Sequence, residues 1–365
     1  MSRGIVVGIV TTGHDVADAR LHRTVAALRR AGAEVWVHGL GDPAKGPVDA
    51  KVTTSPRTGR FKRYLRSLTW PWKGRADILL TIDPDTAPAA RLATRLRGGR
   101  WVADVHEDYR ELVRDRSWVR PAMLAFVRSF VSFLNRVIAR ADLVLVADEH
   151  VPPRDAKNRF VMRNEPDVTV LPPMPAEAPG TEAPRALYIG DNRTSRGLRV
   201  MIEAVAATAD DEVPWHLDLV GPVATGDRDW FDARLREPDA RLITFHDRQP
   251  PRDAWRLASH ASVGMCLLAD TAAFREAMPS KVYEYLAMGL PTIATALPRV
   301  RRLLEDEEAG VIVEDADATT AALRRFIGDD QFRWHLITGA RVAGERLRYR
   351  PSPYDEAARR IVELA

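Results

Sequence analysis

The sequence contains little of what builds an extracellular or membrane-spanning protein. It has one cysteine, Cys266, so no disulfide can form within the chain, and the apolar run around it predicts a buried thiol. The chain opens on the strand-like run IVVGIV and lacks the pattern of a cleavable leader. No apolar run approaches the roughly 18 residues of a membrane span. These absences favour a reducing compartment, and we expect a cytoplasmic protein.

Several catalytic and cofactor motifs are missing as well. The sequence shows no cluster with metal-ligand spacing, no nucleophile elbow and no P-loop. Acidic residues are scarce in one half. Residues 1–165 carry 29 Lys and Arg against 18 Asp and Glu, a net charge of +11, whereas residues 166–365 carry −7. Any anionic surface should therefore meet the first half.

Short apolar runs alternate with segments of helical spacing along the whole chain. In the first half, strands are predicted at Ile5–Val10, Glu34–His38, Ile78–Ile82, Trp101–Asp104 and Leu143–Val146. In the second half, they are predicted at Ala186–Ile189, His216–Val220, Ser262–Leu268, Thr292–Ala296 and Gly310–Val313. This alternation is typical of doubly wound, largely parallel sheets. The 365 residues suffice for two domains, and a proline-rich connector at Asn164–Pro184 separates them.

One segment of the first half, Lys51–Arg75, holds eight basic residues and no acid. Apolar and aromatic residues are interleaved with the charges: Phe61, Tyr64, Leu65, Leu68, Trp70 and Trp72. The mixture suits the interface of an anionic bilayer. An exposed helix whose aromatics pack inward explains it too. Nucleic-acid binding is disfavoured because no nucleic-acid fold motif accompanies the charges.

A second apolar segment, Trp118–Ala141, predicts a long helix. Arginines interrupt it too often for a membrane span. It is either a core helix before the strand Leu143–Val146 or part of the same membrane-facing surface.

The most informative stretch is Phe274–Pro291, FREAMPSKVYEYLAMGLP. Pro279 suits the first position of a helix and Gly289 the residue just past its end. The free N–H groups of a helix N-terminus, with Lys281 beside them, can hold a phosphate. Glu284, one turn further, could accept hydrogen bonds from ribose hydroxyls. A capped surface helix without a ligand explains the same spacing.

Three further stretches place polar side chains after predicted strands, where open α/β sheets bind ligands. The loop Gly190–Gly197, GDNRTSRG, carries Arg193 and Arg196 at a helix start, where they can cradle a pyrophosphate. The cluster Asp104-Val105-His106-Glu107-Asp108 follows a strand of the first half. His14 could contact an acceptor, although a loop histidine without that role is the simpler interpretation.

The run PSKVYEYLAMGLPTIAT, with Glu276 and Glu284 separated by seven residues, resembles the donor-binding segment of family 4 glycosyltransferases. The resemblance implies a GT-B-like fold, with two doubly wound Rossmann-type α/β domains facing across a cleft. They would span 1–165 and 166–349, and a terminal helix at 350–365 would cross back onto the first domain. The implied activity is retaining, hexosyltransferase-type transfer from a nucleotide diphosphate sugar, with no cofactor and no bound metal.

The resemblance also implies residue roles. In that family the second glutamate holds the ribose and the first contacts the sugar, which gives these roles to Glu284 and Glu276. Ser280 and Lys281 would lie beside the diphosphate. His106, in a similar D-x-H-E context, would lie against the donor sugar.

The loop GDNRTSRG resembles the family's G-R-x-x-x-x-K-G loop with two departures. Asp191 stands where an arginine is usual, and Arg196 replaces the lysine. Arg196 is therefore the stronger phosphate candidate and Arg193 the weaker one. His246 and Asp247 resemble the family's loop for the nucleobase.

For the acceptor, the charge asymmetry and the segment Lys51–Arg75 predict a lipid-linked glycan or a glycolipid, and hence a role in polysaccharide biosynthesis. The enzyme would be peripheral to the inner face of a membrane and would not bind nucleic acid. Two alternatives stay open. One is a nucleotide-sugar epimerase of the same fold. The other is a non-catalytic nucleotide-binding relative, which the departure at Asp191 suggests.

Overall fold

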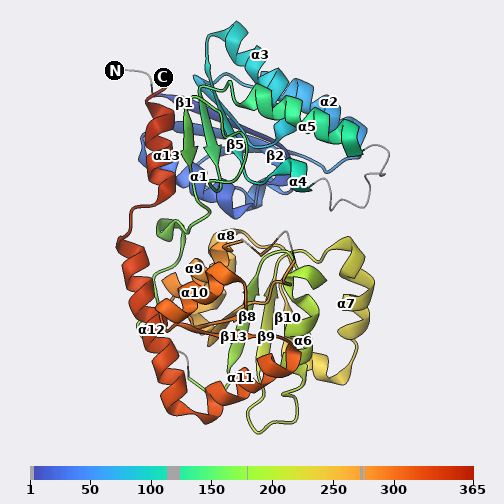
Figure 1. Cartoon of the computed structure of the whole chain (residues 1–365), viewed down its shortest axis with the longest axis vertical. Helices are drawn as coiled ribbons and strands as arrows, with labels where there is room; N and C mark the ends of the chain where they lie inside the picture. The colour runs from blue at the N-terminus through green and yellow to red at the C-terminus, as the bar shows by residue number, and fades with distance from the viewer. Residues whose placement is uncertain (1–3, 113–123, 179, 272–273, 276) are drawn as a thin grey trace. The chain divides into compact units, whose positions relative to one another are not determined.

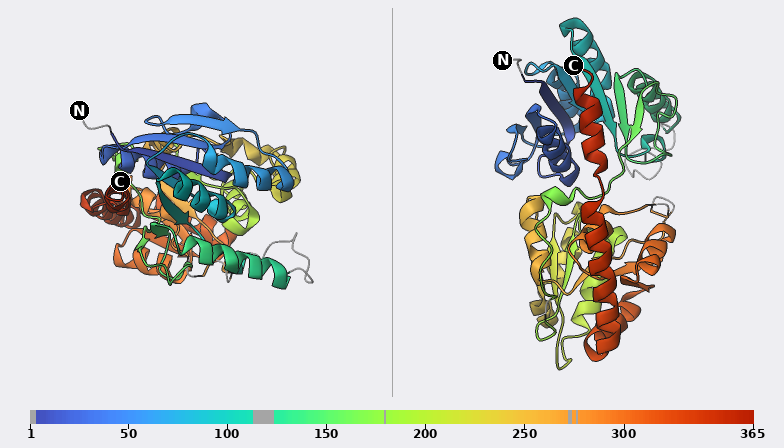
Figure 2. Two further views of the ribbon diagram at one scale, coloured as in Figure 1. Left: turned by 90° about the horizontal axis from the view of Figure 1, so that it is seen from above. Right: turned by 90° about the vertical axis from the view of Figure 1, so that its left-hand side faces the viewer.

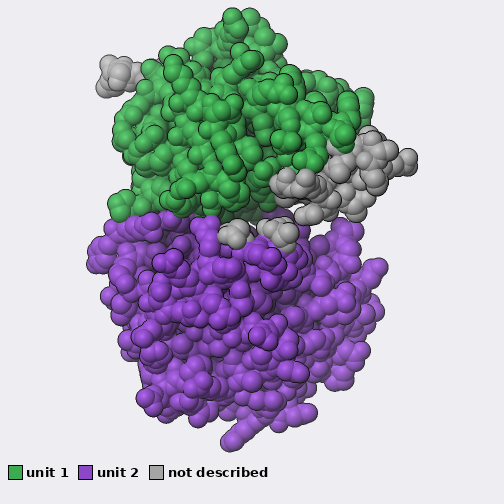
Figure 3. All heavy atoms as spheres, viewed as in Figure 1, with its two compact units in different colours: residues 1–164, 351–365 green, residues 165–350 purple. Residues whose placement is uncertain are grey.

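A computed structural model describes residues 4–112, 124–178, 180–271, 274–275 and 277–365. Within it the chain forms two compact units (Figure 3). The first unit comprises residues 1–164 and 351–365, and the second comprises residues 165–350. The sequence predicts the boundary between the two domains at 165/166 and the start of the returning helix at 350.

Glu308 and Asp247 are the non-glycine residues with positive φ among those described.

The first unit contains seven parallel strands in the order β3-β2-β1-β4-β5-β6-β7 (Figure 1). They are β1 (Val6–Asp15), β2 (Glu34–Leu40), β3 (Lys51–Ser55), β4 (Ile78–Thr81), β5 (Arg100–Val105), β6 (Leu143–Val146) and β7 (Arg159–Val161). The central strands are continuous apolar runs because helices cover both faces of the sheet. The strand order reverses between β1 and β4, which makes this a doubly wound sheet.

Helices lie on both faces of this sheet. One face packs against α1 (Ala19–Arg30) and the returning helix α13 (Pro353–Val362), which contact each other (Figure 2). The other face packs against α3 (Ala87–Arg97), α5 (Leu124–Ile138) and the short helix η2 (Trp70–Trp72). Helix α2 (Arg60–Thr69) contacts α3, and α4 (Tyr109–Leu112) contacts α5.

The first strand is longer than the sequence predicts. Thr11–His14, for which the sequence predicts a loop, belong instead to β1, which ends at Asp15. The reason lies elsewhere in the chain, because the Asp83 carboxylate accepts hydrogen bonds from the backbone N–H groups of Thr12 (2.8 Å) and Gly13 (3.1 Å). A buried carboxylate thus replaces the hydrogen bonds that a neighbouring strand would supply.

The second unit contains six parallel strands in the order β10-β9-β8-β11-β12-β13. They are β8 (Arg185–Ile189), β9 (His216–Val220), β10 (Ile243–Phe245), β11 (Val263–Cys266), β12 (Thr292–Thr295) and β13 (Gly310–Val313). The helices are α6 (Leu198–Ala206), α7 (Arg228–Arg234), α8 (Pro251–Arg256), α9 (Ser280–Ala287), α10 (Pro298–Asp306), α11 (Ala316–Gly328) and α12 (Asp330–Tyr349). Here the strand order reverses between β8 and β11.

The helices of the second unit also cover both faces of its sheet. Side chains of α6 and α11 share one core cluster, while α8 and α9 contribute to the opposite side. Across the described residues of both units, none of the helices is long and apolar enough to cross a bilayer.

Candidate functional site

The loop after β8 lies where the strand order of the second sheet reverses, which is where doubly wound sheets bind ligands. It begins at Gly190 (φ +150°) and ends at Gly197 (φ +86°). A Cβ atom on Gly197 would lie 2.3 Å from the carbonyl oxygen of Leu267, so the loop touches the backbone after β11. Glycine is required there by both the left-handed conformation and the close approach.

Helix α9 faces this loop, and hydrogen bonds of the Tyr285 side chain fix the helix to strand β8. The Tyr285 hydroxyl lies 3.1 Å from the carbonyl oxygen of Leu187 and accepts a hydrogen bond from the backbone N–H of Ile189. Pro279 is the N-cap residue, one position earlier than the sequence suggests, and makes no side-chain capping bond. Pro279 itself therefore supplies no side-chain cap to the first N–H groups of α9.

Lys281 lies in the first turn of α9, and its side chain is buried. Its Nζ lies 3.7 Å from the centre of the Tyr188 ring and has no hydrogen-bond partner among the described residues. A Cβ atom on Gly190 would lie 2.8 Å from that Nζ, so the ammonium group sits directly against the start of the loop. A buried cation without a partner is costly unless an anion binds beside it.

The two arginines of the loop differ. Arg193 donates a 2.6 Å hydrogen bond to Asp191, the residue that departs from the family pattern. Each of the two arginines has a buried Nε without a described hydrogen-bond partner, but an ion pair is described only for Arg193. Burial raises the pKa of the Cys266 thiol to about 11, and the positive charges of Lys281 and Arg196 oppose that rise. The structure thus brings Arg196 and Lys281 together near the end of β11, while Arg193 turns to Asp191.

The remaining predicted residues of α9 lie close to Lys281. Ser280 Oγ donates a 3.2 Å hydrogen bond to Glu284 Oε2, and the Glu284 side chain is buried. Glu276, the predicted sugar contact, lies outside the described residues. One buried carboxylate and one buried ammonium group therefore occupy the same short helix.

The predicted nucleobase loop contains a second polar group. His246 Nε2 lies 2.7 Å from Asp218 Oδ1, and Arg185 Nε donates a 2.6 Å hydrogen bond to the other oxygen. Burial alone would raise the pKa of the Asp218 carboxyl, but the hydrogen bonds from Arg185 and His246 outweigh it and lower that pKa. The His246 side chain is thereby fixed by Asp218.

His106 belongs to a polar cluster in the first unit, at the carboxyl end of β5. Its Nε2 lies 3.0 Å from Asp104 Oδ2, and Arg20 donates hydrogen bonds of 3.0 and 2.7 Å to the two oxygens of the same carboxylate. Burial would raise the pKa of Asp104, but the charge of Arg20 and the contact with His106 hold it well below its usual range. Asp104 therefore stays ionised and orients His106.

His14 joins this cluster, although the sequence favoured no role for it. Its ring centre lies 5.2 Å from that of His106, and its Nδ1 lies 3.4 Å from Asp83 Oδ1. Burial would lower the pKa of His14, but the hydrogen bond and the charge of Asp83 raise it from 6.5 to about 9. The signal that could have found this pair is positional, because β1 and β4 are the two strands at which the order reverses.

Arg63 of α2 completes the cluster from a neighbouring helix. It donates hydrogen bonds to Asp83 Oδ1 (3.2 Å) and Asp85 Oδ2 (3.1 Å). Asp83, Asp85 and Asp104 therefore each have an arginine partner within the same unit.

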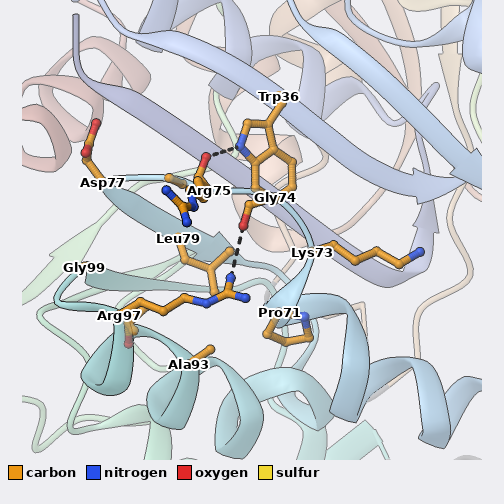
Figure 4. A pocket seen from close by; sticks show the side chains of 12 residues that line it. Trp36, Pro71, Lys73, Gly74, Arg75, Asp77, Leu79, Ala93, Arg97 and Gly99 are labelled. Carbon is orange, nitrogen blue, oxygen red and sulfur yellow. Dashed lines mark hydrogen bonds between the residues drawn. The ribbon is translucent and has the colours of Figure 1, made fainter. Parts of the chain in front are cut away.

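A cavity of about 370 Å³ lies away from both clusters, at the amino ends of the strands of the first sheet (Figure 4). The Trp36 indole donates to the carbonyl oxygen of Arg75, and the Arg97 guanidinium donates to those of Gly74 and Trp72. Because these donors are bound to backbone carbonyls and none of the residues predicted to bind the donor or to act in catalysis lines the cavity, we assign it no part in the site.

Comparison with known proteins points to one family. Residues 183–329 match the family model described as "Glycosyl transferases group 1". This match lies within the second unit and includes the loop after β8 and helix α9. No curated protein sequence matches the chain at a significant level.

Solved structures resemble the whole chain. The sucrose-phosphate synthase of Thermosynechococcus elongatus is 16% identical, with a TM-score of 0.67 over 99% of this chain and 98% of that one. The Anabaena protein HepE, in complex with UDP-glucose, is 12% identical, with a TM-score of 0.66 over 99% and 100%. WaaG, a glycosyltransferase involved in lipopolysaccharide biosynthesis, is 14% identical, with a TM-score of 0.64 over 98% and 99%. At these identities the likeness is one of fold, and it confirms the predicted GT-B-like class of two doubly wound α/β domains.

Proposed function

We propose that this protein is a glycosyltransferase that moves a sugar from a nucleotide diphosphate sugar to an acceptor hydroxyl. The observation that carries the proposal is the buried Nζ of Lys281, without a described partner, in the first turn of α9 and near Arg196. A helix N-terminus, the buried ammonium group of Lys281 and the half-buried guanidinium of Arg196 form a site for a diphosphate. The family match over the second unit and the UDP-glucose bound by HepE support the same ligand class.

The proposed reaction proceeds with retention and without a bound metal. The acceptor oxygen forms a bond to the anomeric carbon on the side of the leaving group, and the bond from that carbon to the phosphate oxygen breaks. The acceptor proton passes to a phosphate oxygen of the departing nucleoside diphosphate. Lys281, Arg196 and the N–H groups of α9 stabilise the negative charge that develops on the diphosphate leaving group. They thereby have the role that a bound divalent cation would otherwise have.

The other predicted residues have the roles that the resemblance to glycosyltransferases implies. Glu284 is buried one turn along α9 and would accept hydrogen bonds from the ribose hydroxyls. Glu276 would contact the transferred sugar, and Ser280 would orient the Glu284 carboxylate to which it donates. His106, held by Asp104, would contact the sugar from the first unit.

The experiment that tests this proposal is an assay of nucleoside diphosphate release from nucleotide sugars, starting with UDP-glucose, with and without an acceptor. A transferase releases the diphosphate faster when the acceptor is present. An epimerase changes the sugar without releasing diphosphate, and a non-catalytic relative binds the donor and does neither. Either of the last two results would overturn the proposal.

Glu284 and Glu276 separate binding from turnover. Glu284→Ala should weaken binding of the nucleotide by about 1.5–3 kcal/mol, as expected for hydrogen bonds to a charged group. Glu276→Ala should leave that affinity unchanged and lower the rate of transfer. Calorimetry with UDP, beside the release assay, measures both. An equal loss of UDP affinity in both variants contradicts the assigned roles.

For the acceptor we propose a lipid-linked glycan or a glycolipid. The support is the charge of the first half, +11 over residues 1–165, together with the eight basic residues of Lys51–Arg75. A panel of polyprenyl-linked and water-soluble sugars as acceptors tests this. Equal rates with both kinds would remove the lipid from the proposal and leave sugar transfer in place.

A further inference from the structure

Three helices on one face of the first sheet, α2, α3 and α5, carry charge of one sign. Within their described bounds they contain nine Lys and Arg residues and no Asp or Glu: Arg60, Lys62, Arg63, Arg66, Arg91, Arg95, Arg97, Arg128 and Arg136. Helix α3 packs against both α2 and α5 (Figure 1). The three helices therefore present one continuous surface, which we call the acid-free face.

Helix α2 turns its apolar side outward. Its four large apolar residues recur at helical spacing and are all exposed, namely Phe61, Tyr64, Leu65 and Leu68. On the opposite side, Ser67 is fully buried and Arg63 binds Asp83 and Asp85. A surface helix of a water-soluble protein has the reverse arrangement, with the apolar stripe on the core.

Helices α3 and α5 extend this exposed apolar surface. Leu92 and Leu96 lie one turn apart on α3, and Leu96 is 69% exposed. On α5, Phe126 is 71% exposed, and Phe130 and Phe133 are exposed with ring centres 6.4 Å apart. The other side of α5 is buried in the core under the sheet.

These exposed side chains are concentrated on one surface. Of the large exposed hydrophobic residues in the described part of the chain, nine lie on α2, α3 and α5, and the others are Val48, Trp334, Val342 and Tyr349. Large exposed apolar patches mark surfaces that another body covers.

We propose that the acid-free face docks on the surface of an anionic lipid bilayer. Lys62, Arg95 and Arg136 are exposed there, and no ion-pair partner is described for them within the residues of the structure. Cations around a phenylalanine- and leucine-rich centre complement anionic headgroups above an apolar layer. The charges would meet the headgroups while the Phe and Leu side chains enter the boundary with the acyl chains.

This face differs from the segment that the sequence singled out. Trp70, predicted as an interfacial anchor, is only 3% exposed and belongs to the core, and Lys51–Ser55 forms strand β3. The anchors are instead Phe and Leu side chains, and more than half of them lie on α3 and α5, outside Lys51–Arg75. The inference rests on this surface alone and stands whether or not the protein transfers sugars.

Two other occupants fit the face less well. A second copy of the chain would bring the same acid-free face to a two-fold interface, so like charges would oppose each other. Nucleic acid would satisfy the cations but would leave Leu65, Leu92 and Leu96 against phosphates or water. Both are outcomes that the following experiment distinguishes.

The experiment is co-sedimentation of the full chain with vesicles of phosphatidylglycerol and phosphatidylcholine, or of phosphatidylcholine alone, at low and high salt. We expect binding to the anionic vesicles only, and weaker binding at high salt. The triple variant Phe126→Ser/Phe130→Ser/Phe133→Ser should lower vesicle affinity by roughly tenfold or more, since it removes three inserted rings. Lys62→Ser/Arg95→Ser/Arg136→Ser should lower it by a similar factor, at low salt only.

The matched control is Trp334→Ser/Val342→Ser on α12, which removes exposed apolar side chains from the second unit. It should bind vesicles like the wild type. All variants change exposed positions, and unchanged unfolding midpoints verify that they fold. UDP binding, measured without vesicles, should be unaffected in each, so loss of docking is distinguishable from loss of the donor site.

Three results would overturn the proposal. The first is a wild-type chain that ignores anionic vesicles. The second is self-association of the wild type in solution that the triple phenylalanine variant abolishes, since the face would then be a contact between copies. The third is tighter salt-sensitive binding to RNA or DNA than to vesicles, lost in the triple cation variant.

Discussion

The two units place polar side chains at the same point of the same kind of sheet, but they balance the charges there in different ways. In the first unit, at the ends of β1, β4 and β5, Arg20 holds Asp104 and Arg63 holds Asp83. In the second unit, at the ends of β8 and β11, Lys281 and Arg196 have buried nitrogen atoms without described partners. In the first cluster Asp83 and Asp104 have arginine partners, whereas no anion is described within hydrogen-bond distance of Lys281 Nζ or Arg196 Nε among the residues that the structure describes.

From this difference we propose that the two clusters bind ligands of different classes. A set of ion pairs that is already balanced orients neutral groups such as hydroxyls, because an added charge would meet no excess of the opposite sign. A buried cation without a partner costs folding free energy that a bound diphosphate offsets. Predictions that disturb the balance in each unit test this reading.

The largest effect is expected from Arg20→Ala. The Arg20 and Asp104 side chains are 7% and 1% exposed, so removing the cation leaves a buried carboxylate without its main partner. The free energy of unfolding should fall by about 3–5 kcal/mol. Urea unfolding measures it.

A matched control lies on the same helix, since Arg30 pairs with Asp355 at 36% and 47% exposure. Arg30→Ala should cost at most about 1 kcal/mol. Similar losses in both variants would show that burial does not distinguish the two pairs.

In the second unit, the free energy of unfolding should respond in the opposite sense when the buried cation, Lys281, is removed. Lys281→Met keeps the length of the side chain and its contact with Tyr188 but removes a buried charge that has no described partner. We expect the ligand-free protein to be as stable as the wild type or more stable. Affinity for UDP should fall by about 1.5–3 kcal/mol, and affinity for uridine should stay the same.

Calorimetry and thermal unfolding measure these two quantities. Arg302→Met on α10 is the control, because that side chain is 83% exposed, and it should change neither. A Lys281→Met protein that is much less stable and binds UDP normally would make Lys281 a structural residue.

The pH dependence of stability tests the His14 contact. The pKa of His14 is raised from 6.5 to about 9, chiefly by Asp83 against the effect of burial. The stabilisation is therefore fully present below pH 6.5 and is lost as the pH rises through about 9. Between about pH 6 and pH 9.5 this contribution to the free energy of unfolding should fall by about 3 kcal/mol.

His14→Gln should remove that pH dependence. His150→Gln, at a side chain that is 58% exposed, should keep the wild-type profile. A wild-type profile that is flat over this range would place the titration of His14 outside the window that its contacts predict.

Much of the fold could be predicted from the sequence because buried parallel strands read as apolar runs. The strands β6, β9 and β13 have the predicted bounds, and β8 differs by one residue. Strands β3, β7 and β10 were missed because they lie at sheet edges, are short and contain polar residues. The extension of β1 could not be predicted, because its hydrogen-bond acceptor, Asp83, is distant in the chain.

The candidate site likewise contains some residues that could be predicted from the sequence and others that could not. Arg196 and Lys281 could be selected from local patterns, namely a glycine-bounded loop and a helix start. The pairing of His14 with Asp83 depends on which strands are neighbours, which a single sequence does not state. The exposed apolar side of α2 could not be predicted either. Helical spacing shows that a helix is amphipathic, but it does not show which side faces the core.

The smallest effect is expected at the ion pair Arg193–Asp191, in which one arginine of the loop after β8 already has an anionic partner. Both side chains are about two-fifths exposed, so the 2.6 Å contact contributes at most about 1 kcal/mol to stability. Arg193→Ala should lower UDP affinity by less than about threefold, since Asp191 already engages that guanidinium. Asp191→Ala should raise UDP affinity, by up to about fivefold, because it removes an anion beside the diphosphate and releases a cation. Calorimetry with UDP in low salt resolves both changes. If Arg193→Ala instead costs as much as Lys281→Met, then Arg193 leaves Asp191 for the diphosphate, and the balanced pair belongs only to the ligand-free protein.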